Sequence, residues 1–455
     1  MLPFMRKRTI FCAFALGLCS DPAPSARQAT APPARQKLAT PARPAPGKLP
    51  NARQASAPPT GWTQWGGPNR NFTSDSKGLA TAWPASGPKK LWSRALGEGH
   101  SAISVDGNRL YTLYRPIVPG SRAEEEVVAA LDAATGAATW EHKFPSSTAG
   151  VNFREGAGPH STPLVTADRV YAAGSRKQIF SLNKADGKVA WSHDLIQEYG
   201  APGPDRGYAC SPLLYNDLLI VSAGGPGQAL MAFNARSGAL AWKGGDFNFS
   251  PASPIVIDVD GQTQLLYFAG NVVAGLDPAT GKTLWTHPHK TDWGLNISTP
   301  IWSPSDRLLF VSSAYGTGSR VLELRQAGGK TTVAEKWFSN RMRIHIGTAI
   351  RVGSYVYGSS GDFGPAFITA VDVHTGKIAW QDRGFARAQL LYADRKLVIL
   401  DEDGNLGIAS VTGEGLQVHA KAAILDHLSW TPPTLVGTRL YVRDRKTISS
   451  FDLGS

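Results

Sequence analysis

The sequence predicts an all-β protein: an eight-bladed β-propeller of four-stranded antiparallel blades, with the ring closed by an N-terminal strand that completes the last blade. Three observations lead to this fold class. The 455 residues include 48 Gly and 32 Pro between many short apolar runs, which favours numerous strands joined by tight turns. A hairpin unit that ends in Trp recurs along the chain. The two ends of the chain look like the two halves of one such unit.

Residues 1–19 have the pattern of a secretory signal peptide. Three basic residues at positions 6–8 precede an apolar run at positions 10–18, which is too short to span a bilayer. The end of this run, Leu16-Gly17-Leu18-Cys19, resembles a bacterial lipobox, although Leu18 stands where that pattern has a small residue. The sequence therefore predicts an exported protein of the periplasm or cell envelope, and it leaves open whether Cys19 is lipidated.

Residues 20–60 are dominated by Pro, Ala, Ser and Gln, and such a composition predicts a disordered linker. Residues 1–60 carry nine Lys or Arg and one acidic residue, so +8 of the formal charge of +12 lies outside the predicted propeller of residues 61–455. The remaining +4 gives no reason to expect a nucleic-acid partner. Removal of the signal peptide leaves Cys210 with or without Cys19, so no framework of intrachain disulfides is available.

The recurring unit is a hairpin with a fixed frame. In each copy Gly precedes Trp by four residues, and Asp or Asn precedes the same Trp by eight. The Asp or Asn side chain can accept bonds from turn amides, Gly supplies a positive φ, and the Trp ring can fill the gap between neighbouring sheets. The five copies are Asp132, Gly136 and Trp140; Asn183, Gly187 and Trp191; Asn234, Gly238 and Trp242; Asp277, Gly281 and Trp285; and Asp372, Gly376 and Trp380.

Two further units depart from this frame. Trp337 follows Gly329 by eight residues instead of four, and Gln417 stands where the unit after Thr412 would have its Trp. A strand pair that opens with a small residue precedes each hairpin, and eight such openings occur before the end of the chain. The count predicts eight blades of four strands.

Segments near the two ends of the chain are expected to close the propeller ring. Residues 448–452 copy the start of the last hairpin, and the chain then stops without the final strand. Residues 86–92, which end in Trp92, look like the missing half. We therefore expect this N-terminal strand to complete blade eight and to protect its edge.

Residues 131–140, with the pattern Leu-Asp-x-x-Thr-Gly-x-x-x-Trp, resemble the tryptophan-docking repeat of quinoprotein-type propellers. Residues 62–70, Trp-Thr-Gln-Trp-Gly-Gly-Pro-Asn-Arg, are similar to the start of exported bacterial proteins with pyrroloquinoline-quinone-like (PQQ-like) propeller repeats. The resemblance covers residues 61–455. It implies the fold and leaves the function open.

Two sets of loops crowd one face around the axis, namely those that enter the innermost strand of each blade and those between its second and third strands, and the candidate ligand-binding residues lie in the first set. Arginines there could bind an anionic ligand and tryptophans could stack on an aromatic one. The polarity of axial loops is also explained by water and backbone groups alone. The candidates are His100, Arg154, Glu155, His160, Arg206, Asn248, Trp293, Asn296, Arg343, His345, Arg387 and Trp430. Their histidines lack local metal-ligand spacing, so we expect no metal site, and no catalytic residue is assigned.

The resemblance implies two alternative functions. The first is a binding or scaffold protein of the cell envelope, similar to the lipoprotein propeller subunit of outer-membrane assembly machinery, which has no cofactor. Such a protein would act as a monomer, would bind an envelope protein or a small ligand, and would contact the membrane only through a lipid anchor. The second is a quinoprotein dehydrogenase that holds PQQ and Ca²⁺ and oxidises an alcohol or a sugar. The adjacent cysteines that many such alcohol dehydrogenases carry are absent, so we favour the non-enzymatic function.

Overall fold

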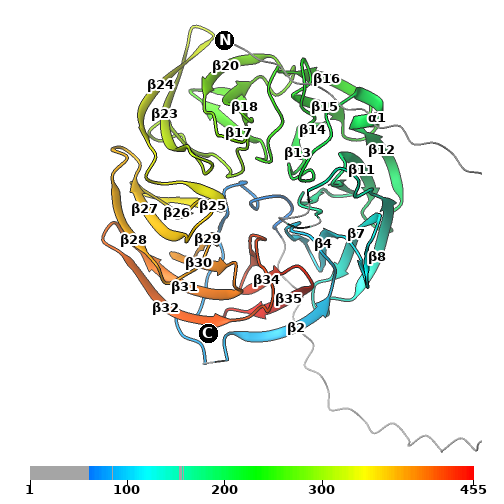
Figure 1. Ribbon diagram of the computed structural model, residues 1–455, viewed down its shortest axis with the longest axis vertical. Helices are drawn as coiled ribbons and strands as arrows, with labels where there is room; N and C mark the ends of the chain where they lie inside the picture. Colours follow the sequence, from blue (N-terminus) through cyan, green and yellow to red (C-terminus); the bar gives the residue numbers. More distant parts are fainter. Residues whose placement is uncertain (1–60, 85, 153–155, 157, 455) are drawn as a thin grey trace, which may run out of the picture. The chain divides into compact units, whose positions relative to one another are not determined.

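The computed structural model describes residues 61–84, 86–152, 156 and 158–454. The predicted signal peptide, Cys19 and the linker lie outside these residues. Eight sheets stand in a ring, so the predicted eight-bladed propeller is confirmed (Figure 1). Among the described residues no helix is long and apolar enough to cross a membrane.

Each blade consists of four antiparallel strands, and the first strand of a blade lies nearest the axis (Figure 1). The strands of blades 1 to 4 are β3 (Ser104–Asp106), β4 (Arg109–Tyr114), β7 (Glu125–Asp132) and β8 (Ala138–Pro145); β9 (Leu164–Val165), β10 (Arg169–Ala173), β11 (Gln178–Asn183) and β12 (Val189–Asp194); β13 (Leu213–Tyr215), β14 (Leu218–Ser222), β15 (Leu230–Asn234) and β16 (Leu240–Gly244); and β17 (Ile255–Val259), β18 (Gln262–Phe268), β19 (Val272–Leu276) and β20 (Thr283–Pro288).

The remaining blades follow the same order around the ring. The strands of blades 5 to 8 are β21 (Ile301–Ser303), β22 (Leu308–Ser313), β23 (Gly318–Ala327) and β24 (Lys330–Ser339); β25 (Ile344–Val352), β26 (Tyr355–Ser360), β27 (Phe367–Asp372) and β28 (Ile378–Asp382); β29 (Ala388–Ala393), β30 (Lys396–Asp401), β31 (Asn405–Val411) and β32 (Leu416–Ala423); and β33 (Thr434–Val436), β34 (Arg439–Arg443), β35 (Thr447–Asp452) and β2 (Lys89–Ala95).

Four short elements of the described chain lie outside the regular four-stranded blades. The strands β5 (Ile117–Val118) and β6 (Ser121–Arg122) form a small hairpin within the loop between β4 and β7. The helix α1 (Leu195–Tyr199) follows β12 and is capped by the Asp194 side chain, which accepts from the amides of Ile196 and Gln197. The strand β1 (Thr73–Ser74) pairs in parallel with the innermost strand of blade 7.

The middle strands of each blade form the core between neighbouring sheets. Six successive residues in β7 are fully or nearly fully buried, whereas the outer strand β8 alternates between exposed and less exposed positions. This difference follows from position, because a middle strand is covered on both faces by adjacent blades and an outer strand meets solvent. The core therefore runs around the ring as a series of layers between the blades.

The repeated hairpin has the chemistry that its residues predict. The Oδ1 atom of Asp132 accepts from the amides of Ala134 and Thr135 at 3.0 and 2.8 Å, and Gly136 has a φ of +74°. The strand that follows is bulged against its partner between Ala130 and Leu131. The bulge gives the Trp140 ring its direction toward the next blade.

Tryptophans of this frame contact the hairpin of the following blade. The indole of Trp140 donates from Nε1 to the carbonyl of Lys184 at 3.0 Å, and its ring lies against Gly187. Gly187 has no room for a side chain, because a Cβ atom there would lie 2.5 Å from Cε3 of that ring. The same donation to the next hairpin links Trp92 to Ala133, Trp191 to Ala235, Trp242 to Pro278, Trp337 to Val373 and Trp380 to Thr412.

The unusual spacing in blade 5 comes from longer strands. Both β23 and β24 have 10 residues, which moves their turn outward and places Trp337 eight residues after Gly329. Trp337 nevertheless donates to Val373 at 2.7 Å and covers Gly376 of blade 6. Trp285 of the preceding blade instead donates to Gln264 of its own blade at 2.7 Å.

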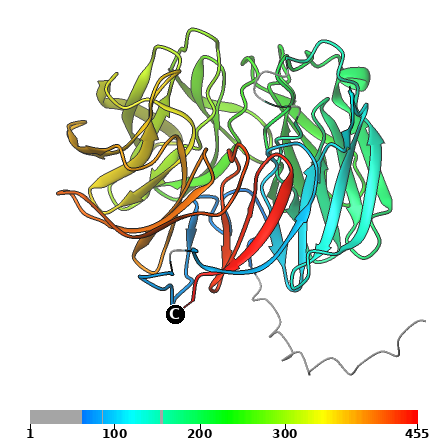
Figure 2. The same ribbon diagram turned by 60° about the horizontal axis from the view of Figure 1, so that its bottom comes forward.

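The N-terminal strand closes the ring as predicted. Strand β2 pairs antiparallel with β35, and Ser93 lies opposite Ser449 in the register. The two hydroxyl groups are 2.8 Å apart. Blade 8 therefore consists of three strands from the C-terminus and one from the N-terminus (Figure 2).

Residues 62–74, which we call the axial segment, run across the inside of the ring before the chain reaches β2 (Figure 1). Trp62 exchanges backbone bonds with Val105 of blade 1, and the amide of Val165 in blade 2 donates to the carbonyl of Thr63. The buried guanidinium of Arg70 donates to the carbonyls of Pro212 and Pro254, from blades 3 and 4. The axial segment thus lies across the centre of the ring and is hydrogen-bonded to several blades at once.

Candidate functional site

The axial segment forms the floor of a pocket on the axis. This axial pocket has a volume of about 160 Å³ and opens on the face where the loops enter the innermost strands, which we call the funnel face. Trp65 of the axial segment contributes to the floor and donates from Nε1 to the hydroxyl of Thr299 at 2.9 Å. Six of the predicted residues have places in or beside this pocket, namely His100, His160, Arg206, His345 and Trp430 in its lining and Trp293 on its rim.

One wall is formed by three neighbouring rings. His100 and His160 lie nearly parallel, with centroids 5.5 Å apart and 7° between their planes, and Trp430 lies 5.4 Å from His100 on the centroids. Burial lowers the pKa of His160 to about 4, and the nearby guanidinium of Arg445 adds to this effect. His160 is therefore neutral at neutral pH, and it presents a flat uncharged surface.

The opposite wall combines His345 with Tyr315. The Nε2 atom of His345 and the hydroxyl of Tyr315 are 2.7 Å apart, and their rings meet edge to face at 4.9 Å. Burial lowers the pKa of His345 to about 4, with Arg387 acting in the same direction. This histidine is also neutral at neutral pH.

The rim carries two exposed aromatic side chains. Trp293 is 56% exposed and Phe363 is 65% exposed, and their ring centroids lie 6.5 Å apart. The guanidinium of Arg206 lies over the Trp293 ring at 5.0 Å and is also paired with Asp205 at 2.9 Å. An exposed Trp beside an Arg and a second ring is the composition typical of the centre of a protein interface.

A carboxylate that was not among the candidates holds part of this site in place. The Oε2 atom of Glu402 accepts from Nε1 of Trp430 at 2.8 Å and from the guanidinium of Arg387 at 3.2 Å. Arg387 also donates to the carbonyl of Asp362 at 2.6 Å. Arg387 therefore supports the wall from behind and is already paired with protein groups.

The remaining candidates are not brought together in the pocket lining. Asn296 is fully buried, and its amide bonds to the carbonyl of Ala269 and to the Ser313 hydroxyl, so its polar atoms serve the fold. Arg343 is exposed and borders a separate hollow with Arg341 and Asn340. Asn248 is exposed beside Gly270. Arg154 and Glu155 lie outside the described residues.

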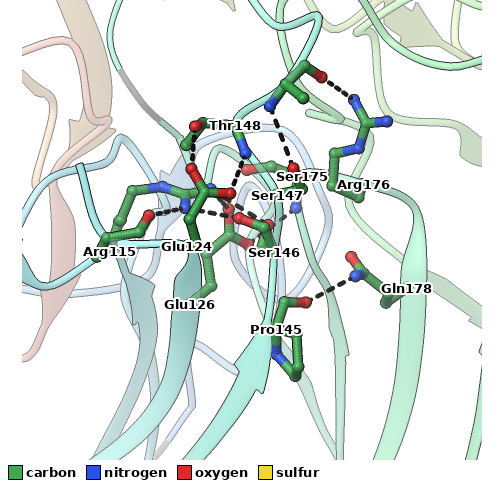
Figure 3. A network of polar contacts seen from close by, with 12 residues as sticks. Arg115, Glu124, Glu126, Pro145, Ser146, Ser147, Thr148, Ser175, Arg176 and Gln178 are labelled. Atoms are coloured by element: carbon green, nitrogen blue, oxygen red, sulfur yellow. Dashed lines mark hydrogen bonds and ion pairs between the residues drawn. The ribbon is translucent and has the colours of Figure 1, made fainter. Parts of the chain in front are cut away.

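A buried ion pair fixes the funnel side of blades 1 and 2. Arg115 and Glu126 are 2% and 0% exposed and lie 2.6 Å apart, and Arg115 also donates to the carbonyl of Ser146 (Figure 3). The second carboxylate oxygen of Glu126 accepts from the amide of Ser175 in blade 2 at 2.9 Å. The pair thus anchors the loop that begins at Arg115 and joins two blades next to the funnel.

The donor set of the described pocket residues does not match PQQ with Ca²⁺. Calcium prefers several carboxylate and amide oxygens, yet Asp205 is the carboxylate in the described pocket lining and it is paired with Arg206. The amide of Asn296 is occupied by backbone and hydroxyl groups. Within the described residues, no group of three His, Cys, Asp or Glu could hold a metal ion. Cys210 is fully buried, and burial raises the pKa of its thiol to about 11.

An eight-bladed ring with inter-blade Trp contacts and an axial pocket defines a propeller of the PQQ-like repeat class. The model of the family described as outer membrane protein assembly factor BamB matches residues 51–152 and 124–382, which is more than half of the chain. The chain belongs to this family.

Known proteins of similar sequence or structure include members of this family. Outer membrane protein assembly factor BamB of Yersinia pestis is 23% identical over 355 residues, which are 72% of this chain and 79% of that protein. The crystal structure of BamB from Moraxella catarrhalis has a TM-score of 0.54 at 17% identity, with 80% of this chain and 100% of that chain covered. Quinohemoprotein alcohol dehydrogenase from Comamonas testosteroni has a TM-score of 0.48 at 12% identity, with 87% of this chain and 81% of that chain covered.

Proposed function

We propose that this protein is an exported scaffold of the cell envelope that takes part in outer membrane protein assembly by binding a partner polypeptide on the funnel face. Membership of the BamB family supports the role, because its relatives are named for that assembly. The observation that supports the binding face is the pair of exposed rings at the rim, Trp293 and Phe363, beside Arg206. Exposed aromatic side chains lose unfavourable hydration when a partner covers them.

The proposal includes the chain outside the propeller. Residues 1–19 would direct export, residues 20–60 would act as a linker, and a lipid on Cys19 would hold the propeller near a membrane surface. The composition of the first 60 residues supports this organisation. Labelling with a radioactive fatty acid, compared between the native chain and Cys19→Ser, tests the anchor.

The binding face is tested by complementation. In a strain that lacks the gene, the native chain should restore the amounts of folded outer membrane proteins, measured by their heat-modifiable mobility on gels. The double variant Trp293→Ser and Phe363→Ser should fail to restore them. A matched control replaces two exposed apolar residues of outer strands, Leu240→Ser and Val418→Ser, which are 42% and 40% exposed. Equal complementation by both double variants would contradict the proposed face, and no effect of the gene deletion would contradict the role.

The dehydrogenase alternative is tested on the purified chain. Titration with PQQ and Ca²⁺ is followed by absorbance and thermal unfolding, and dye-linked oxidation of alcohols and sugars is measured in parallel. The scaffold function predicts neither saturable binding nor turnover. Stoichiometric PQQ binding with turnover would overturn it.

A further inference from the structure

The axial pocket has mainly apolar and aromatic walls, and the acidic and basic side chains in its described lining, Asp205 and Arg206, are paired with each other. Its walls include Leu295, Ile297, Ile346 and Phe249, and the ion pair of Arg206 with Asp205 stands at its edge. His160 and His345 are neutral at neutral pH, because burial holds the pKa of each at about 4. A charged ligand would lose its hydration against these apolar and uncharged walls, and Arg206 in the described lining is already paired with Asp205, so the chamber is complementary to an uncharged group.

The size and shape of the chamber fit one ring. Its volume of about 160 Å³ is close to that of an apolar protein cavity of about 150 Å³ that binds benzene. The rings of His100, His160 and Trp430 form one wall, and Trp65 forms the floor of the chamber at the axial segment. Flat aromatic walls favour an aromatic occupant through offset or edge-to-face contacts.

The rim extends this chamber toward a larger partner. Trp293 and Phe363 are exposed beside Tyr315, which also lines the chamber. The ring centroid of Tyr315 lies 6.4 Å from that of Trp293 and 5.8 Å from that of Phe363. A free aromatic compound inside the chamber would leave both exposed rings uncovered. A polypeptide that inserts one side chain would cover them with the residues on either side of it.

We propose that the axial pocket binds a single uncharged aromatic side chain of an extended segment of the partner polypeptide, with the flanking residues of that segment lying on Trp293 and Phe363. This inference rests on the proposed function and specifies the chemistry of its partner. The pocket acts as the anchor and the rim provides the remaining contact area.

The test measures binding of defined probes to the full purified chain by calorimetry and saturation-transfer NMR. The probes are phenylacetamide, its charged analogue phenylacetate, and two blocked alanine pentapeptides, of which one has phenylalanine at its centre. We expect phenylacetamide to bind about tenfold more tightly than phenylacetate. The phenylalanine peptide should bind more tightly than phenylacetamide, and the all-alanine peptide should not bind.

Variants that fill the chamber provide the control. Ala209→Phe and Ile346→Trp add volume at two positions of the lining, and each should abolish probe binding without a change in thermal stability. Val256→Phe adds the same ring to a hollow on the other side of the axial segment and should bind as the native chain does. If one of these two variants fails to fold, probe binding by the other one tests the inference.

The inference would be overturned if no probe binds, if phenylacetate binds as tightly as phenylacetamide, or if both folded filling variants still bind. Binding of phenylacetamide that the peptide does not improve would assign the pocket to a free aromatic compound and would also overturn it. Complementation by Ala209→Phe separates the two proposals. Normal assembly in that variant, with the rim double variant inactive, would leave the scaffold function standing without the anchor.

Discussion

Several cationic side chains are buried on the funnel side of the ring, and each has its own arrangement of oxygen atoms. Arg443 is fully buried and donates to carbonyls of Gly97 and Leu113 at 3.0 and 2.6 Å. Lys177 is fully buried and donates to the carbonyl of Pro202 at 2.7 Å, and burial lowers its pKa to about 8. Arg115 differs because it has a carboxylate partner, Glu126.

Replacement of this carboxylate should be costly. Glu126→Gln leaves the buried guanidinium of Arg115 without its counter-charge, and we expect the free energy of unfolding to fall by about 3 kcal/mol. Urea denaturation measures the change. Glu124→Gln alters an exposed carboxylate two residues away that bonds to Thr148, and we expect a much smaller fall because the amide oxygen of glutamine can still accept there. Equal stability of the two variants would contradict the importance of the pair.

Buried histidines should make the fold sensitive to acid. Burial lowers the pKa of His345 to about 4 and that of His289 to about 3, from a value of 6.5 in the unfolded chain. Between these values the unfolded chain binds protons that the folded chain does not, so stability falls as the pH falls below 6.5. Each histidine contributes up to about 1.4 kcal/mol per pH unit in this window.

Unfolding by urea between about pH 7 and about pH 4 measures this dependence. His345→Gln cannot bind the extra proton in the unfolded state and should make the dependence shallower. A dependence as steep as that of the native chain would show that His345 titrates normally in the folded protein.

At the scale of single residues, the sequence predicted part of the candidate site. Residues that enter the innermost strands, such as His100 and His160, are placed by the repeat, so their position near the axis follows from the pattern. Tyr315, Phe363 and Glu402 lie in loops between the second and third strands of their blades, which were expected on the same face, but no single residue of these loops was named as a candidate. The direction in which such a loop leans depends on its packing, and the repeat does not encode it.

At the scale of the element, the hairpin and the Trp of the preceding blade form one unit of contact. The Asp, Gly and Trp frame predicted both the turn and the contact between sheets, because each residue has a separate chemical task there. Blade 5 shows the limit of a fixed spacing. Trp337 reaches the same contact from a longer hairpin, since the position of the ring depends on strand register and not on its distance from the turn.

The glycine of this frame should be required for packing of the Trp ring from the preceding blade. Gly136→Ala would place a methyl group 2.7 Å from the Trp92 ring at a φ of +74°, and we expect a loss of about 3 kcal/mol in the free energy of unfolding. Gly107→Ala has a φ of +59° with nothing within 4 Å, so only backbone strain of about 1 kcal/mol should appear. The difference between the two variants measures the contact with Trp92, and equal losses would argue against it.

At the scale of the whole molecule, closure of the ring was predictable and the axial segment was not. Residues 86–92 complete a pattern that residues 448–452 begin, so their pairing could be read from the repeat. The axial segment has no periodic pattern. Its course follows from individual bonds, such as those of Arg70 to two different blades, which only the folded ring brings together.

Closure can be made covalent. Ser93 and Ser449 face each other across β2 and β35, so the double variant Ser93→Cys and Ser449→Cys should form a disulfide. Because this bond spans most of the chain, we expect the free energy of unfolding to rise by about 3 to 4 kcal/mol under oxidising conditions and to return with a reductant. Ser93→Cys alone is the control. A pair that does not oxidise would indicate that the two strands are not in this register.

The pairing of β2 with β35 also determines when the protein can finish folding. Ser93 and Ser449 are separated by 356 positions, so β2 is among the first ordered parts of the chain to be synthesised and must wait for one of the last. Contacts between such distant residues form slowly, because a long loop has to close before they give any stabilisation. Until the C-terminus is available, β2 and the axial segment have unpaired backbone groups and uncovered apolar side chains. A chain built in this way needs protection from aggregation until β35 is available to pair with β2.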